Sequence, residues 1–149
     1  MIGVAIIFAA IVVAAIAAHA AFAAFAAPAA AAAAASAAAN QLVALDVAAE
    51  SYYADHAATP PADLYARVGP YVTVVPSDPA DQGHGADYTV ETYASGDGWV
   101  IDDGYRHPAS ALRGLRRWDG TPGDTPHGTC DDDCTRLVYD SGVGVLGAP

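Results

Sequence analysis

The stretch that decides the fold is the N-terminal run MIGVAIIFAAIVVAAIAAHAAFAAFAA (residues 1–27), continued by the alanine-rich PAAAAAAASAAA (residues 28–39). No Asp, Glu, Lys or Arg occurs before Asp46. About 20 apolar residues cross the hydrocarbon core of a bilayer, whereas a helix in a soluble bundle needs polar side chains on its outer face. The run is therefore too long and too apolar for a wholly soluble cytoplasmic protein.

Three interpretations of this uncharged run compete. A cleaved secretory signal has a basic start and only ~7–15 apolar residues, but no cation follows Met1 here. A single-span anchor accounts for residues 1–27 and leaves the uncharged stretch up to Leu45 in water. A helix buried against copies of itself accounts for the whole run, because alanine faces allow close packing and no unpaired charge is buried. This third interpretation makes residues 1–45 the core of a polymer. Its large side chains would be Ile2, Val4, Ile6, Ile7, Phe8, Ile11, Val12, Ile16, Phe22 and Phe25.

Residues 40–57 change from uniformly apolar to amphipathic. At 100° per residue, one arc of the helix holds the apolar and aromatic side chains, and Glu50, Ser51 and Asp55 lie off it. We predict a single helix from about residue 2 to 57 that packs on a domain through this arc. The head-packing face consists of Leu42, Leu45, Ala49, Tyr52 and Tyr53, with His56 beside them.

Two proline signals shape the predicted helix. Pro28 removes one backbone donor and predicts a kink or a local opening. The segment Thr59-Pro60-Pro61 ends the helix.

The rest of the chain, residues 58–149, is predicted to form a small turn-rich domain with strands. The predicted strands are Tyr71–Val75, Tyr88–Tyr93, Trp99–Asp102, Arg136–Tyr139 and, more weakly, Val143–Leu146, and the predicted helical turns are Asp63–Val68 and Ser110–Leu115. The aromatic side chains expected in the core against Tyr52, Tyr53 and Leu45 are Tyr65, Tyr71, Tyr88, Tyr93, Trp99, Trp118 and Tyr139. Because so small a head buries little surface alone, we expect it to include the amphipathic half of the helix, giving a globular unit from 40 to 149.

Charge and motifs exclude several functions. The chain has 17 acidic and six basic side chains, for a formal charge of −11. Binding to nucleic acid or to anionic lipid headgroups needs a basic surface, so neither is predicted. The sequence has no G-x-S-x-G, H-E-x-x-H or G-x-x-x-x-G-K-[ST] motif. We therefore predict that the protein is not an enzyme and holds no organic cofactor.

The layout resembles type IV pilins and the pseudopilins of type II secretion, in which a long N-terminal helix, apolar and then amphipathic, packs on a small antiparallel sheet. The sharpest match is AAESYYADH (residues 48–56), which leads through Thr59-Pro60 to YVTVVPSDP (residues 71–79). The resemblance covers about residues 1–102 in layout, with matching motifs between 48 and 101.

This resemblance implies an α+β fold and a structural subunit that polymerises into an extracellular helical filament. Residues 1–27 would span the membrane before assembly. The implied partners are copies of the same chain, prepilin peptidase, the pilus assembly machinery and the lipid bilayer. Two alternatives stay open: a pseudopilin of a secretion system, and a membrane-anchored extracytoplasmic binding domain that does not polymerise.

The N-terminus departs from most bacterial members of the family, which have Phe first and Glu fifth. Met1 and Ala5 stand at those positions here. The missing carboxylate removes a salt bridge that is thought to guide assembly. The resemblance implies a mature subunit in which Met1 is the N-methylated residue. The helix-distorting proline of the family lies nearer the start than Pro28, so we expect any melted segment to be displaced toward residues 20–30.

The segment CDDDC places two cysteines around three aspartates. In an exported chain an oxidised pair is favoured over free thiols, so we predict a Cys130–Cys134 disulfide. Asp131, Asp132 and Asp133 are either a solvated acidic loop or calcium ligands, although the alternating pattern of an EF-hand is absent.

Two further features carry hypotheses. The arginines Arg113, Arg116 and Arg117 either form a solvated face or contact acidic residues of a neighbouring subunit, such as those of the segment Asp46–Glu50. His19, inside the apolar run, is interpreted as a neutral histidine bonded to the backbone of a neighbouring helix.

Overall fold

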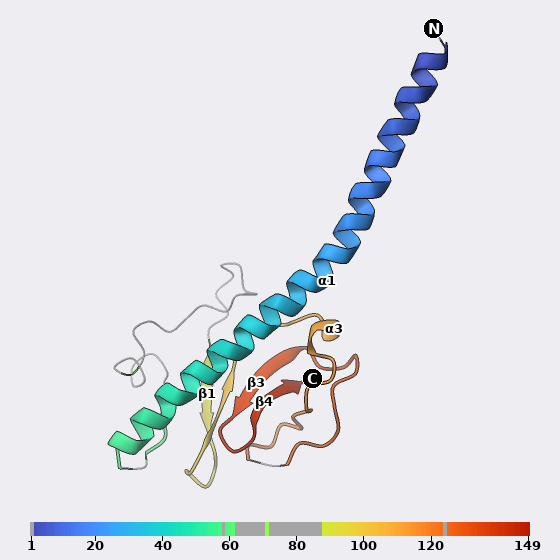
Figure 1. The fold of residues 1–149 in the computed structure, drawn as a ribbon. Coiled ribbons are helices and arrows are strands. Elements are labelled where there is room, and N and C mark those ends of the chain that lie inside the picture. The colour runs from blue at the N-terminus through green and yellow to red at the C-terminus, as the bar shows by residue number, and fades with distance from the viewer. Residues whose placement is uncertain (1, 58, 62–70, 72–87, 124) are drawn as a thin grey trace. The chain divides into compact units, whose positions relative to one another are not determined.

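The computed structural model describes residues 2–57, 59–61, 71, 88–123 and 125–149, with backbone alone for 2–25. The chain divides into two compact units, Met1–Ala30 and Ala31–Pro149. The second unit contains the sheet and the half of the helix that packs on it (Figure 1). The α+β fold predicted from the sequence is thereby confirmed.

Helix α1 runs from Ile2 to Asp55 as one helical segment that includes Pro28. The predicted local opening is therefore not seen, and the predicted kink stays a prediction because the two units are described separately. The helix ends two residues before the predicted limit. The next peptide N–H, from His56, still bonds to Tyr52 O at 3.0 Å, and Ala57 has a left-handed φ of 54° that ends the helical path.

Four strands form one antiparallel sheet in the order β1-β2-β3-β4. They are β1 (Thr89–Thr92), β2 (Trp99–Asp102), β3 (Arg136–Asp140) and β4 (Gly144–Ala148). All four strands were predicted, and their bounds differ from prediction by at most two residues. The short helix α3 (Ala109–Leu112) overlaps the helical turn predicted for Ser110–Leu115, beginning one residue earlier and ending three residues earlier.

The edge of the sheet beyond β4 is covered by the segment that follows α3. Gly147 N donates to Arg116 O at 2.9 Å, and Trp118 N donates to Gly147 O at 2.8 Å. The segment runs parallel to β4, through the bridge between Arg117 and Gly147. It also pairs with the chain that enters the disulfide loop, through an antiparallel bridge between Arg116 and Thr129. These contacts satisfy backbone groups that an open edge would expose.

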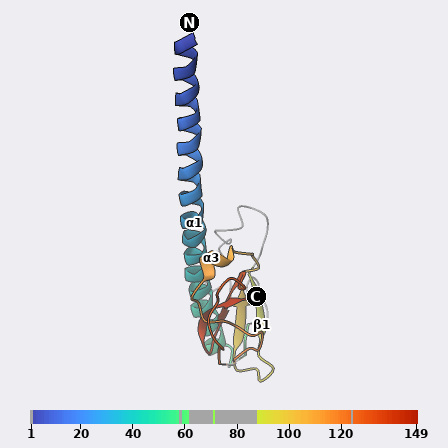
Figure 2. The same cartoon turned by 90° about the vertical axis from the view of Figure 1, so that its right-hand side faces the viewer.

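The sheet has two apolar faces because successive side chains of a strand point to opposite sides. One face carries Trp99, Ile101 and Leu137 against α1, and the other carries Val100 and Val138. Figure 2 shows α1 lying along one side of the sheet. The buried residues of the helix-facing core are Ala35, Ala38, Leu42, Leu45, Ala48, Ala49, Tyr88, Trp99, Ile101, Leu112, Cys130, Cys134 and Leu137.

The predicted head-packing face of the helix is confirmed. Leu42, Leu45 and Ala49 are fully buried, Tyr52 is 7% exposed, and Tyr53 packs at the margin of the core. Packing also begins earlier than predicted, because Ala35 and Ala38 already belong to the core. The periodicity of larger side chains does not reveal these positions, since alanine occupies every face of the helix there.

One part of the predicted aromatic core was wrong. Tyr93 and Trp118 do not pack against the helix but border the second cluster, which is made by Val100, Val138, Leu146 and Ala148. The physical reason is that the sheet buries both faces, the second one under the loop that begins at Trp118. Tyr88, Trp99, Tyr71 and Tyr139 do lie in or against the helix-facing core.

Some predictions fall outside the described residues. These are the helical turn Asp63–Val68 with Tyr65, and residues 72–75 of the strand predicted from Tyr71. Tyr71 itself is described: its hydroxyl donates to Asp55 Oδ2 at 3.0 Å, and its ring lies edge-on to Tyr52.

Candidate assembly surface

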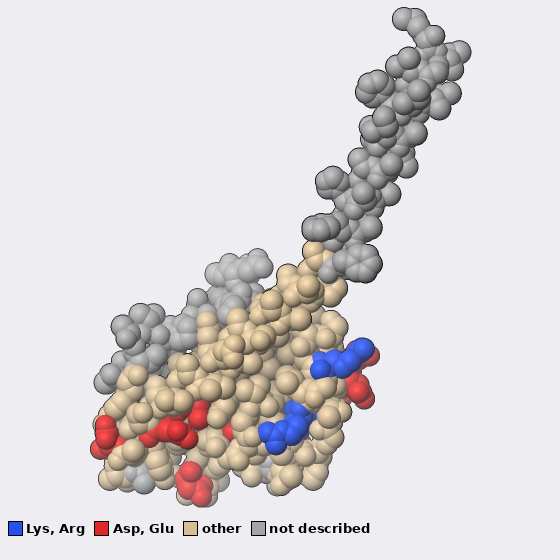
Figure 3. Space-filling model, in the orientation of Figure 1, with Lys and Arg blue, Asp and Glu red and all other residues tan. Residues whose placement is uncertain are grey.

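The side of α1 that faces away from the sheet is uncharged along most of its described length. Exposed side chains recur every three or four residues on this side, and Val43 and Val47 are exposed by 42% and 57%. Charge appears only at Glu50, one turn beyond Val47. We call this face the outer stripe, and it consists of Ala33, Ser36, Asn40, Val43 and Val47. In the view of Figure 3, acidic side chains on α1 appear only toward its C-terminal end.

The described helix is also long and apolar enough to cross a membrane by length and composition, over Ala26–Asp55. A helix in the core of a soluble protein passes the same test, and from Ala35 onward α1 packs on the sheet. The predicted polymer-core side chains between Ile2 and Phe25, together with His19 and Met1, lie outside the residues whose side chains are described. Their roles stay predictions.

Asp46 fixes the contact between α1 and the sheet and was missed as a site residue. Its side chain is 4% exposed, and Trp99 Nε1 donates to its Oδ1 at 2.9 Å. The hydroxyl of Tyr139 bonds to the same carboxylate. The signal was available in the sequence, because Asp46 lies four residues after Leu42 and three before Ala49, on the buried arc.

Burial of this network changes its proton affinities. Loss of water around Asp46 raises the pKa of its carboxyl group above 3.8, although the bonds from Tyr139 and Trp99 act in the opposite direction. Burial, followed by the charge of Asp46 and the hydrogen bond to it, raises the pKa of Tyr139 to about 12. Both groups titrate as parts of the helix–sheet contact.

Asp140 organises the end of the head opposite the disulfide. It is fully buried, and its carboxylate accepts hydrogen bonds from Tyr93 Oη at 2.5 Å and Gly123 N at 2.8 Å. The backbone N–H of Gly142 also donates to it at 2.9 Å. One buried carboxylate thus holds together the β1–β2 turn, the loop after Trp118 and the β3–β4 turn.

The predicted disulfide is confirmed. Cys130 and Cys134 are joined, with Cα atoms 5.5 Å apart, and both are fully buried. The sulfur atoms lie over Gly147 of β4, where a Cβ atom would overlap Cys130 Sγ. A side chain at this position would therefore displace the disulfide.

The acidic loop between the cysteines pairs with arginines of the same chain. Arg113 Nη2 lies 2.5 Å from Asp132 Oδ1, and Arg117 pairs with Asp133. The hypothesis that Asp46 meets these arginines in a neighbouring copy was wrong for that residue, because Asp46 is buried in its own chain. Arg116 has no carboxylate partner among the described residues, and its Nη2 donates to Val143 O at 2.6 Å.

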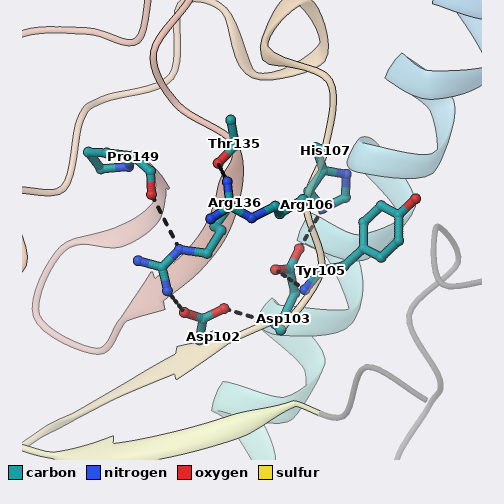
Figure 4. Close-up of polar contacts among 9 residues, drawn as sticks. Asp102, Asp103, Tyr105, Arg106, His107, Thr135, Arg136 and Pro149 are labelled. Atoms are coloured by element: carbon teal, nitrogen blue, oxygen red, sulfur yellow. Dashed lines mark hydrogen bonds and ion pairs between the residues drawn. The ribbon is translucent and has the colours of Figure 1, made fainter. Parts of the chain in front are cut away.

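A second polar cluster lies at the end of β2 (Figure 4). Arg136 Nη1 pairs with Asp102 Oδ2 at 2.7 Å, and the buried His107 Nε2 lies 2.5 Å from Asp103 Oδ2. The other ring nitrogen of His107 is buried without a partner among the described residues. The pair ties the connection after β2 to β3, since His107 N also donates to Thr135 O at 2.6 Å.

The described residues contain no group of three or more His, Cys, Asp and Glu side chains placed to hold a metal ion. The calcium alternative for Asp131, Asp132 and Asp133 thus gains no support from the part of the loop that is described. No known protein family, curated protein or solved structure matches the chain. The description of the fold as a long apolar N-terminal helix with a small antiparallel sheet therefore rests on the sequence and the structure alone.

Proposed function

We propose that this protein is a structural subunit that polymerises into an extracellular filament of the type IV pilus class. The observation that carries the proposal is the division of α1 into two faces. One face is buried in the head through Leu42, Leu45 and Ala49, while the outer stripe exposes Val43 and Val47.

An uncharged helix face that exposes two valines favours a partner, because burial of apolar surface is worth about 25 cal/mol per Å². N-terminal to the outer stripe the sequence continues into alanines and then into the uncharged run of residues 1–27. Copies of α1 packed side by side would cover the whole stripe without burying a charge. A contact between unlike surfaces, repeated without closure, yields a filament.

Before assembly, the segment 1–27 holds the subunit in the membrane. Polymerisation then transfers this segment from lipid to the filament core, and residues 58–149 form the coat. A pseudopilin would use the same contacts in a shorter fibre.

The alternative from another class is an anchored head that stays monomeric. It is favoured by the length and apolar composition of the helix, which suit a membrane span without any polymer. The two functions differ in what the outer stripe does: a monomeric anchor has no use for an apolar stripe that extends to Val47, on the part of the helix that packs on the head.

The test is electron microscopy of material sheared from cells that make this chain. We expect filaments that disappear on deletion of the gene and whose density contains a bundle of long central helices. The variant Val47→Asp should abolish them, whereas Thr92→Asp, at an exposed position of β1, should not. Protein that stays in the membrane fraction without filaments would contradict the proposal and favour the monomeric anchor.

A further inference from the structure

We propose that Arg116 of one copy binds Glu50 of a second copy at the C-terminal end of the outer stripe. The inference rests on the proposed function and names one polar contact that orients neighbouring subunits. The arginines of the head differ in whether they already pair with a carboxylate of their own chain.

Three of the five arginines in the described residues pair with aspartates of their own chain, namely Arg113, Arg117 and Arg136. Arg106 reaches only the hydroxyl of Thr135, at 3.4 Å. Arg116 is exposed and lacks a carboxylate, as described above. Arg106 and Arg116 are thus the two exposed arginines of the described residues without an acidic partner, and Arg116 is the one whose guanidinium is held on a backbone carbonyl oxygen.

Arg116 is also held in place before any partner binds. Its carbonyl oxygen accepts from Gly147 N at 2.9 Å, it bridges to Thr129, and its guanidinium is fixed on Val143 O. One guanidinium nitrogen is used in that bond, so the remaining donors can meet a carboxylate. A side chain that is already ordered loses less entropy on binding than a free one.

Glu50 is the acidic group that a copy packed on the outer stripe would meet. It lies seven residues after Val43 and three after Val47, hence on the same face of α1, and it is exposed. No ion pair joins Glu50 to any described cation of its own chain. In Figure 3 acidic side chains gather near the end of α1, and arginines lie on the other side of the visible face.

The two residues also favour the open kind of contact. A two-fold contact between parallel copies of the outer stripe would place Glu50 beside Glu50, and like charges repel. A contact between the stripe of one copy and the Arg116 side of the next brings opposite charges together. Because these surfaces differ, the contact can repeat without closing.

A charge swap tests the proposal in the full chain. Arg116→Glu and Glu50→Arg should each reduce the amount of sheared filament at least tenfold, while the double variant should restore most of it. Arg106→Glu and Glu91→Arg, at exposed positions of the same head, serve as controls and should leave filament yield unchanged. The melting temperature of each full-length variant checks that the head is still folded.

A second measurement does not depend on yield. The double variant Glu50→Cys and Arg116→Cys should give a ladder of covalent oligomers under oxidising conditions, and either single variant should not. Single charge reversals that polymerise like wild type, or a double variant no better than the singles, would overturn the contact and leave the proposed function standing. Absence of filaments from the wild-type chain would overturn the proposed function together with this contact.

Discussion

Trp99 donates a hydrogen bond of 2.9 Å from its indole Nε1 to the carboxylate of Asp46, across 53 residues of sequence. Both side chains are 4% exposed. The bond joins the helix to β2, and Tyr139 adds a second bond from β3. The first charged residue of the chain therefore contributes a polar contact to the packing of α1 on the sheet, on the side of the helix opposite to the outer stripe.

Replacing Asp46 separates its charge from its hydrogen bonds. Asp46→Leu should lower the free energy of unfolding by about 2–5 kcal/mol, because the donors of Trp99 and Tyr139 lose a buried acceptor at about 1–3 kcal/mol each. Asp46→Asn keeps an acceptor oxygen and should stay within about 1 kcal/mol of wild type. Urea unfolding followed by Trp fluorescence measures both variants, and equal losses would contradict the role given to the hydrogen bonds.

The same residue gives a pH dependence with a defined sign. Burial raises the pKa of Asp46 above its unfolded value of 3.8, so the folded chain binds this proton more readily than the unfolded one. The resulting stability is present below pH 3.8 and is lost as pH rises through the folded pKa. The stability of wild type relative to Asp46→Asn should thus improve toward acid pH, and a difference independent of pH would contradict the prediction.

The raised pKa of Tyr139 predicts a loss of folding stability at alkaline pH. Its pKa of about 12 exceeds the ordinary value of 10, since burial and the charge of Asp46 disfavour the phenolate. The stability that this group contributes is complete below pH 10 and is lost between pH 10 and 12. Tyr139→Phe should therefore lose less stability than wild type over that interval, as measured by denaturant unfolding at each pH. Parallel curves for the two proteins would refute it.

Gly147 tests the packing under the disulfide. A Cβ atom there would overlap Cys130 Sγ and lie 3.3 Å from Cys134 Sγ, so Gly147→Ala should destabilise the head by about 1–3 kcal/mol through overpacking. The cost should fall sharply in a Cys130→Ala, Cys134→Ala background, where the sulfur atoms are absent. A double-mutant cycle from thermal unfolding measures the coupling, and additive effects would show that the glycine is needed for another reason.

The elements that the sequence predicted well are those decided by local pattern. Pro60 and Pro61 mark the end of α1, and runs of β-branched and aromatic residues between glycines mark β2 and β3. The face of α1 followed from the spacing of Leu42, Leu45 and Ala49. Each of these signals lies within a short window of sequence.

What could not be predicted depends on contacts between distant segments. The two-sided burial of the sheet, which moved Trp118 away from the helix, results from a loop that folds back over the far face. The partners of Asp46 and Asp140 come from other elements, so a carboxylate that looks solvated by its own neighbours is buried. The sequence alone could not distinguish Arg116 from Arg113 and Arg117. The structure distinguishes it, because Arg113 and Arg117 form ion pairs with aspartates of their own chain.

The alanine-rich part of the outer stripe separates a filament subunit from a monomeric anchor. Ala33 is exposed on the helix, so Ala33→Asp should leave the fold of the head intact and its melting temperature nearly unchanged. In a polymer the same aspartate would be buried against another copy without a partner, at a cost of several kcal/mol per subunit. We therefore expect Ala33→Asp to abolish filaments, while the matched variant Ala94→Asp, in an exposed turn of the head, preserves them. The measurement is the sheared-filament assay with both variants at equal expression. Filaments of normal length from Ala33→Asp would place this helix face outside the polymer core and would contradict the packing proposed for the outer stripe.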